Sequence, residues 1–362
     1  MNKQITIISM IALSISIAGC EKDTDLTEPT AQVEQDFTPY TIDFKNFPDP
    51  NLPADNPLTQ AGFDLGKQLF YDPILSRDNS ISCASCHNQS SAFDDNNRFS
   101  IGVDGQKGSR QAMAIFNMAW NSNGFFWDGR AELLRHQAVL PIQDELEMDE
   151  TIDNVVAKLS EMDEYKNRFI KAFGSPIIDE KSISLALEQF MLTLVSNQSK
   201  YDDYLAGKTQ LSASEERGRK LYFTEYNQFI PDSSGADCAH CHGGINFEND
   251  RYMNNGLDQV ITDKGFGAVS GRARDEGKFK VVSLRNIALT APYMHDGRFQ
   301  TLEEVVEHYN SGIQRSATLD PAIEMTMSTG LRLTDQDKKD LVAFLKTLTD
   351  EKFITNSKFS KP

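Results

Sequence analysis

Basic side chains are scarce in this chain of 362 residues. Lysine and arginine together number 36, against 53 aspartates and glutamates, so the formal net charge at pH 7 is −17. Nucleic-acid binding depends on basic patches, so this composition argues against a nucleic-acid partner. An acidic surface would attract a basic redox partner, but a merely solvated acidic surface accounts for the charge equally well.

Long apolar runs are scarce as well. The run at residues 5–17 is too short for a permanent membrane-spanning helix and follows Lys3, so residues 1–19 are predicted to be a signal peptide. The small residues before Cys20 resemble a bacterial lipobox, which implies cleavage there and lipid attachment to the sulfur; a signal peptide with a coincidental cysteine is the alternative. Residues 20–45, acidic and rich in threonine, predict a flexible tether. We therefore expect an exported protein of the periplasm or cell envelope, held to a membrane by lipid only.

Cysteine is also rare, and its distribution is informative. Four of the five cysteines lie in two copies of C-x-x-C-H, which read CASCH at residues 83–87 and CAHCH at residues 238–242. This pattern is the attachment signature of a c-type haem, because both thiols project to one side of a helical turn and the histidine lies beneath the iron. Cys20 is the only cysteine left over, so no disulfide can form within the chain.

Each motif has a complete set of haem-binding residues. The predicted covalent attachment sites are Cys83, Cys86, Cys238 and Cys241, and the predicted axial ligands of the two irons are His87 and His242. A zinc site or a thioredoxin-like dithiol would also use C-x-x-C, but the pairs lie far apart and neither alternative requires the following histidine. Covalent haem attachment is extracytoplasmic in bacteria, in agreement with the signal peptide.

Helical periodicity predominates along the rest of the chain, and strand-like alternation is scarce. Apolar stripes and capping residues predict helices at residues 59–70, 182–194 and 334–348. Loops are expected at residues 94–108 and 246–277, and a connection between halves at residues 200–212. Self-similarity between the halves, beyond the two motifs, is too weak to establish a duplication.

Several further segments accompany the two motifs, among them NPLT at 56–59, LFYDP at 69–73, FWDGR at 126–130, LRN at 284–286 and TAPYMHDG at 290–297. With these segments, the chain from about residue 50 to residue 350 resembles the bacterial di-haem cytochrome c peroxidase family, which includes MauG. The resemblance implies a mainly α fold of two cytochrome c-like domains, each with one covalently bound c-type haem. We expect residues 46–200 to form the N-terminal peroxidatic haem domain, residues 201–350 the C-terminal electron-transfer haem domain, and residues 351–362 a tail.

The resemblance also implies roles for four residues outside the motifs. Glu147 matches the family's distal glutamate, which carries a proton between the two oxygens of peroxide, although its run of acidic neighbours alone would suggest a solvated face. A carboxyl group in a pocket of low dielectric has its pKa raised into the range useful for this work. Gln137 would orient peroxide, Pro141 would shape the pocket, and Trp127 would lie between the haems.

A structural calcium ion is implied between the haems. Thr290 and Pro292 match the two carbonyl donors of the family. Gln111 occupies the position of the family's asparagine ligand, which keeps an oxygen donor but moves it by one methylene. We therefore expect one Ca²⁺ held by these three residues.

The chain departs from the family at the first haem. Many members close the peroxidatic iron with a distal histidine, but this chain has none between residues 88 and 135, and Val103 stands approximately at that position. We therefore expect the first haem to stay open to peroxide without reductive activation.

The second departure is at the second haem. Residues 301–304 form a capping box that predicts a short helix, on which Tyr309 shares one buried face with Leu302, Val305 and Val306. Tyr309 falls where peroxidases of the family have a methionine ligand and MauG has a tyrosine. His308 and Met294 are competing candidates. Methionine would raise the haem potential, whereas a phenolate favours ferric and higher oxidation states.

These features predict a di-haem peroxidase that reduces hydrogen peroxide to water with electrons from a small periplasmic donor such as cytochrome c or a cupredoxin. One alternative is MauG-like oxidation of a protein or small molecule at long range. An alternative of another class is a di-haem electron-transfer cytochrome without peroxide chemistry. The sequence leaves open whether the protein forms a homodimer.

Overall fold

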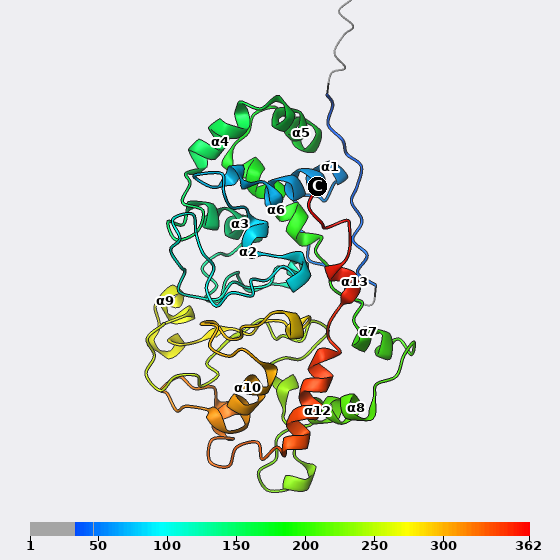
Figure 1. Ribbon diagram of the computed structural model, residues 1–362, viewed down its shortest axis with the longest axis vertical. Coiled ribbons are helices and arrows are strands. Elements are labelled where there is room, and N and C mark those ends of the chain that lie inside the picture. The colour runs from blue at the N-terminus through cyan, green and yellow to red at the C-terminus, as the bar shows by residue number, and fades with distance from the viewer. Residues whose placement is uncertain (1–32, 46) are drawn as a thin grey trace, which may run out of the picture. The chain divides into compact units, whose positions relative to one another are not determined.

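Two hydrophobic clusters organise the described residues, which in this computed structural model are 33–45 and 47–362 (Figure 1). The predicted signal peptide, Cys20 and the first half of the predicted tether lie outside these residues. The first cluster belongs to an N-terminal lobe, residues 36–199 together with 351–362. The second cluster belongs to a C-terminal lobe, residues 200–350. Both lobes lie within the single compact unit Glu34–Pro362.

The N-terminal lobe is built from helices joined by long connections. Its helices are α1 (Gln60–Tyr71), α2 (Cys83–Cys86), α3 (Leu134–Gln143), α4 (Ile152–Ser160), α5 (Asp163–Phe173), α6 (Glu180–Leu192) and α13 (Glu351–Ile354). Short 3₁₀ turns at Pro73–Leu75, Gln89–Ser91 and Met118–Trp120 complete it.

The C-terminal lobe is also mainly helical. Its helices are α7 (Lys200–Leu205), α8 (Ala213–Phe223), α9 (Phe266–Ser270), α10 (Leu302–Glu307), α11 (Pro321–Glu324) and α12 (Asp335–Lys346), and a π-helical turn spans His308–Gly312. Strands β1 (Tyr252–Met253) and β2 (Phe279–Lys280) pair antiparallel, with Tyr252 opposite Lys280. Among the described residues, no helix combines the length and apolar character needed to cross a membrane.

The three helices predicted from periodicity are confirmed, with small shifts at their ends. Thr59 caps α1 by accepting a hydrogen bond from the backbone N–H of Gly62, and Thr334 forms a capping box with Asp337 at the start of α12. Helix α6 begins and ends two residues before the predicted range, because Asp179 provides its cap. These helices are specified locally, by caps and apolar stripes.

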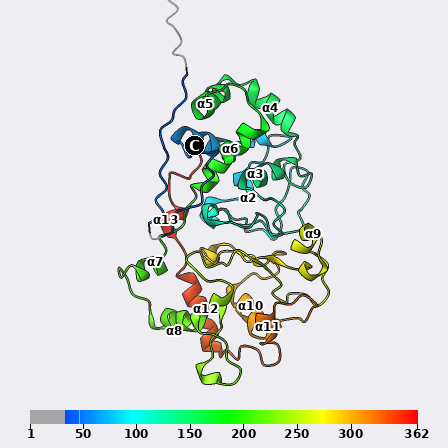
Figure 2. The ribbon, with the colours of Figure 1, turned by 180° about the vertical axis from the view of Figure 1, so that it is seen from behind.

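One pair of helices forms the frame of each lobe: α1 packs against α6, and α8 packs against α12 (Figures 1 and 2). A glycine makes each close approach possible. A Cβ atom on Gly66 would lie 1.9 Å from the carbonyl oxygen of Ala186, and one on Gly218 would lie 1.9 Å from that of Asp340. Only glycine fits at either crossing.

The same helix pairs share a sequence pattern. From its glycine, α1 reads GKQLFY and α8 reads GRKLYF, while the partner helices contain ALEQFMLTL at residues 186–194 and DLVAFLKTL at residues 340–348. The two helix pairs therefore share a short pattern at their crossings, and the duplication stays a hypothesis.

Two predicted loop regions contain regular structure. The connection at residues 200–212 includes helix α7, whose Tyr201 packs in the second cluster. The expected loop at residues 246–277 includes strand β1 and helix α9. The predicted domain boundary between residues 200 and 201 stays a prediction.

The chain is packed at both ends of the described part. The backbone N–H of Asp36 donates to the carbonyl of Lys171, and Tyr40 stacks on Phe63 with ring centroids 4.6 Å apart, so packing begins before the predicted tether ends. The predicted tail is part of the N-terminal lobe. Its Phe353 and Phe359 are buried in the first cluster, and the C-terminus lies beside α1 (Figures 1 and 2).

Replacing Phe353 with alanine should lower the free energy of unfolding by about 3–5 kcal/mol, because the ring is 3% exposed and its removal leaves a cavity. Phe37 is 72% exposed, so Phe37→Ala is the matched control. Urea denaturation of the haem-loaded protein measures both. Equal, small effects would show that the tail does not contribute to the core.

Candidate functional site

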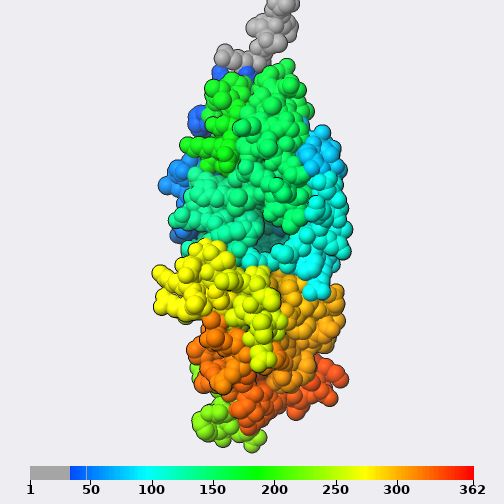
Figure 3. Space-filling model, turned by 90° about the vertical axis from the view of Figure 1, so that its left-hand side faces the viewer, coloured from blue at the N-terminus to red at the C-terminus, as the bar shows by residue number. Residues whose placement is uncertain are grey.

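A cavity of about 650 Å³ is lined by residues of both haem motifs. His87 and His242 both line it, and so does Trp127. Figure 3 shows a hollow in the surface of the N-terminal lobe where the cyan and teal segments meet. The two motifs therefore share one connected space, most of which is bounded by apolar side chains.

The first motif is held in a helical turn. Helix α2 spans Cys83–Cys86, and Ser82 and Ser85 form its capping box. The Nδ1 atom of His87 lies 2.9 Å from the carbonyl oxygen of Phe93. A carbonyl only accepts, so Nδ1 carries the proton and Nε2 has a free lone pair for a metal.

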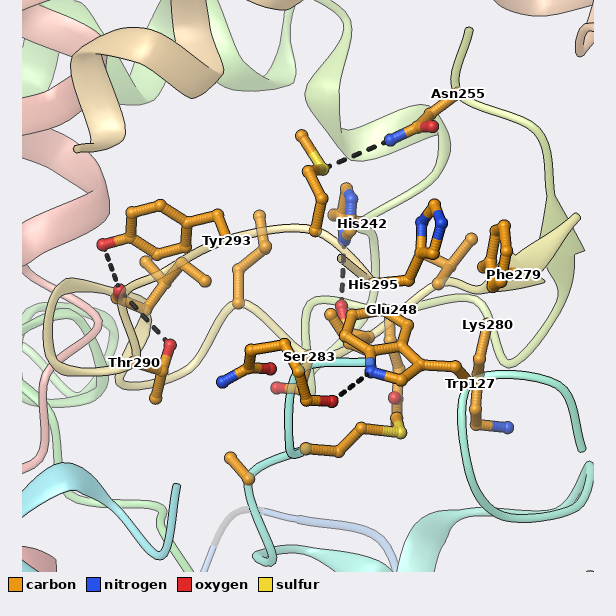
Figure 4. Close-up of a pocket in the computed structure, with 18 of the residues that line it drawn as sticks. Trp127, His242, Glu248, Asn255, Phe279, Lys280, Ser283, Thr290, Tyr293 and His295 are labelled. Carbon is orange, nitrogen blue, oxygen red and sulfur yellow. Dashed lines mark hydrogen bonds between the residues drawn. The ribbon is translucent and has the colours of Figure 1, made fainter. Parts of the chain in front are cut away.

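The second motif repeats this arrangement. Nδ1 of His242 lies 3.3 Å from the carbonyl oxygen of Phe247 and 3.1 Å from that of Val282 (Figure 4). Burial lowers the pKa of His242 to about 4 and also lowers that of His87, so both imidazoles are neutral, as iron ligation requires. The donor sets therefore fit one c-type haem in each lobe.

Glu147 lies in a turn that follows α3. Pro141, in the last part of that helix, has no N–H to donate, and the helix ends two residues later. The chain then turns back, with the N–H of Glu147 donating to Asp144 O at 2.9 Å and that of Met148 donating to Pro141 O at 3.2 Å. Glu147, Pro141 and Gln137 consequently line the cavity together with His87.

The carboxyl group of Glu147 is perturbed by this environment. Burial raises its pKa to about 7, the negative charge of Asp144 adds to the increase, and Arg130 opposes it. The neighbouring residues Asp144 and Glu145 are exposed, whereas Glu147 faces the cavity and Glu150, at the end of the acidic run, is buried. A group that is half ionised near neutral pH can both accept and donate a proton.

The loop that carries Val103 is fastened to the Glu147 turn. The N–H of Val103 donates to the carbonyl of Glu147 at 2.9 Å. A Cβ on Gly102 would lie 2.2 Å from the carbonyl oxygen of Leu146, so this approach requires glycine. Arg77 pairs with Asp149 and so ties the other side of the turn.

No second histidine lies near His87 in the described part of the chain. His240, His242 and His295 line the cavity with residues of the C-terminal lobe, whereas His136 is exposed. Val103 does not line the cavity. The wall near His87 therefore offers Glu147 and Gln137 rather than an imidazole.

Trp127 is fixed by contacts with both lobes. Its indole N–H donates to the carbonyl of Gln111 at 2.8 Å, and its own carbonyl accepts from the N–H of Lys280 at 2.8 Å. Figure 4 shows the ring in the part of the cavity that holds His242. The ring is therefore held at the boundary between the lobes.

The three predicted calcium ligands also line the cavity. Gln111, Thr290 and Pro292 contribute to one wall, and the amide nitrogen of Gln111 donates to the buried carboxyl of Asp94 at 3.1 and 3.2 Å. Among the described residues, no group of three or more His, Cys, Asp or Glu side chains could hold a metal. A cation here would therefore depend on carbonyl and amide oxygens, and calcium stays a prediction.

The structure distinguishes the three candidate ligands of the second haem by whether they line the cavity. Tyr309, on the π-helical turn after α10, lines the cavity, and so does Met294. His308 does not line it, because its Nε2 lies 3.1 Å from the carbonyl oxygen of Asn255. Leu302, Val305 and Val306 line the cavity with Tyr309, as the predicted helix face requires.

Two further cavity residues were not predicted from the sequence. Glu248 accepts a hydrogen bond from Asn246 at 2.5 Å, and burial raises its pKa to about 7. Asn255 donates from its amide nitrogen to the hydroxyl oxygen of Tyr309 and to the sulfur of Met294. Neither residue belongs to a motif, and only the folded chain brings them to the site.

Comparison with known proteins gives the family. Residues 60–210 match the family model described as di-haem cytochrome c peroxidase, and residues 215–349 match that of cytochrome c. The methylamine utilization protein MauG of Methylophilus methylotrophus is 33% identical, over 82% of this chain and 84% of that protein. The cytochrome c551 peroxidase of Nitrosomonas europaea is 38% identical, over 80% of both chains.

A solved structure gives the same result. The crystal structure of a MauG-like protein associated with microbial copper homeostasis superimposes with a TM-score of 0.80 at 35% identity, over 89% of this chain and 99% of that one. The chain therefore belongs to the di-haem cytochrome c peroxidase family that includes MauG, with the two-domain, mainly helical cytochrome c-like fold and the two c-type haems of that family.

Proposed function

We propose that this protein reduces hydrogen peroxide at the haem above His87. One observation carries the proposal: Glu147, Gln137 and Pro141 line the wall around His87, and no other histidine of the described residues lies in that part of the wall. A haem supplies the electrons and the electrophilic metal for cleaving the oxygen–oxygen bond. The side chains must then bind peroxide and move its protons.

Glu147 performs the proton transfer. Its carboxylate accepts a proton from one peroxide oxygen and returns it to the other, so that water leaves rather than hydroxide. Burial keeps its pKa near 7, which suits a group that must act as base and then as acid. Gln137, one helical turn before Pro141 on α3, supplies an amide that can hold peroxide by hydrogen bonding.

A haem held by Cys238, Cys241 and His242 would receive electrons from the donor, and Trp127 would lie on their way to the first haem. The net charge of −17 favours a small periplasmic donor with a basic face, such as a cytochrome c or a cupredoxin. A lipid anchor at Cys20 would hold the enzyme at the cell envelope. Calcium bound by Gln111, Thr290 and Pro292 would stiffen the region between the haems.

Tyr309 favours a second candidate function, MauG-like oxidation of a protein or small molecule. A phenolate ligand would stabilise the oxidised second haem, which suits shared oxidising equivalents better than electron storage. A pure electron carrier would have no use for Glu147 beside an open haem. Rapid steady-state turnover with reduced cytochrome c or cupredoxin would support the peroxidase function. The absence of such turnover would support the MauG-like oxidase function.

The resting ferric protein should show a high-spin signal by EPR and should react with peroxide without prior reduction, because no histidine is available to close the first haem. Stopped-flow absorption measures the reaction. An entirely low-spin spectrum, or a reaction only after partial reduction, would contradict the open first site.

Glu147→Gln should lower kcat by about 10²–10⁴-fold, since the amide cannot accept the proton. The wild-type rate should rise with pH through about 7, because the carboxylate is the form that accepts it and burial has raised its pKa to about 7. This rise of the rate with pH should be absent from the Glu147→Gln variant. Glu145→Gln, at an exposed position in the same run, is the control and should keep the wild-type profile.

Gly102→Ala should displace the Glu147 turn, since the new methyl group would overlap the carbonyl of Leu146. We expect a loss of about 1–3 kcal/mol in stability, together with slower peroxide turnover. Gly108→Ala is the matched control in the same loop, because its Cβ would have no neighbour closer than 3.9 Å. Similar stability and turnover of the two variants would show that the close approach of this loop to the Glu147 turn is not needed for either property.

A further inference from the structure

Among the described residues, Asn255 is the side chain that hydrogen-bonds to both cavity-lining candidate ligands of the second haem. Its Nδ2 atom lies 3.3 Å from the hydroxyl oxygen of Tyr309 and 3.3 Å from the sulfur of Met294. The amide nitrogen carries two hydrogens, so it can donate to both acceptors at once. The side chain also lines the cavity itself (Figure 4).

The backbone of Asn255 restrains the third candidate. Its carbonyl oxygen accepts a hydrogen bond from Nε2 of His308 at 3.1 Å. This bond uses the nitrogen that would otherwise be free to ligate a metal, and it holds the ring outside the cavity lining. One residue therefore contacts all three candidates and treats them differently.

The turn that carries Asn255 is anchored from two sides. The carbonyl of Asn254 accepts from the N–H of Asp320, and the carbonyl of Gly256 accepts from the N–H of Gln314, just after the π-helical turn that carries Tyr309. These bonds therefore fix the position of the Asn255 amide relative to the phenol of Tyr309. Side chains that support a functional group act in this way only when they are themselves fixed.

Met294 is held in an unusual backbone conformation. Its φ angle is 74°, a left-handed value that costs free energy for a residue with a side chain. The conformation directs a thioether into the cavity, where Asn255 is its hydrogen-bond partner. Met294 is therefore a ready competitor for the iron.

We propose that Asn255 is a positioning residue that selects Tyr309 over Met294 as the second axial ligand of the haem above His242. An N–H donor stabilises negative charge on the phenol oxygen and so favours the hard ligand for ferric iron. The same amide holds the soft sulfur of Met294 by a hydrogen bond. The inference rests on the proposed role of Tyr309.

The test uses the haem-loaded protein in its resting ferric state. Asn255→Asp keeps the shape but removes the N–H donors, and Asn255→Ala removes the side chain. We expect both variants to lose the resonance Raman bands of an iron-bound phenolate and to gain the near-infrared charge-transfer band of methionine-ligated haem. The reduction potential of the second haem should rise, as methionine ligation requires.

Asn254→Ala is the matched control. Asn254 lies in the same turn and is 4% exposed, but its amide donates to Ser316 and Thr318 rather than to a ligand. It should keep the wild-type spectrum. Three results would overturn the proposal. The phenolate signature could persist in both Asn255 variants, it could be lost equally in Asn254→Ala, or a bis-histidine spectrum could replace it.

Two further measurements separate this inference from the proposed function. An unchanged low-spin spectrum in Tyr309→Phe would overturn the selection of Tyr309 but would leave peroxide reduction at the first haem intact. Failure of the wild-type protein to consume peroxide would overturn the proposed function, whereas the spectra of the Asn255 variants are recorded without peroxide and would still decide the inference.

Discussion

The hydrogen bond from each motif histidine to a backbone carbonyl is the constraint on which the rest of the site depends. It fixes the tautomer and directs Nε2 into the cavity, so the haem position follows from it. In both lobes a carbonyl beside the imidazole belongs to a buried phenylalanine in the left-handed region, Phe93 with φ 60° and Phe247 with φ 55°. In the C-terminal lobe the carbonyl of Val282 is a second and closer partner. The strained conformation turns the carbonyl back towards the imidazole. The glycine-mediated helix pairs then hold the walls around it.

This shared frame makes the difference between the lobes chemical rather than architectural. In the N-terminal lobe the cavity wall beside the motif supplies Glu147, a carboxyl group that burial brings to a pKa of about 7. In the C-terminal lobe the corresponding space receives Tyr309, held by Asn255. Under the proposed function, the first lobe would move protons and the second would close its metal with a side chain.

The sequence predicts the features that depend on neighbours in the chain. The C-x-x-C-H motifs and the capping box of Thr334 and Asp337 are local, so the sequence reveals them directly. Contacts between distant residues are different. Asn255 and Tyr309 are 54 positions apart, and nothing in the segment around Asn255 marks it as a cavity residue. The role of Glu147 is predicted only by the family resemblance, because its run of acidic neighbours by itself suggests a solvated surface.

The link between the lobes holds Trp127 in a fixed position, as its proposed role in electron transfer requires. Arg110 donates to Asp128 at 2.6 Å and to Asp263 at 2.8 Å, so one guanidinium joins the turn that carries Trp127 to a loop of the C-terminal lobe. Such charge-assisted bonds are directional and resist displacement. Together with the indole bond to Gln111, they fix the ring relative to both motifs. Electron transfer depends steeply on separation, so a rigid aromatic ring would maintain a constant path if, as proposed, electrons pass Trp127.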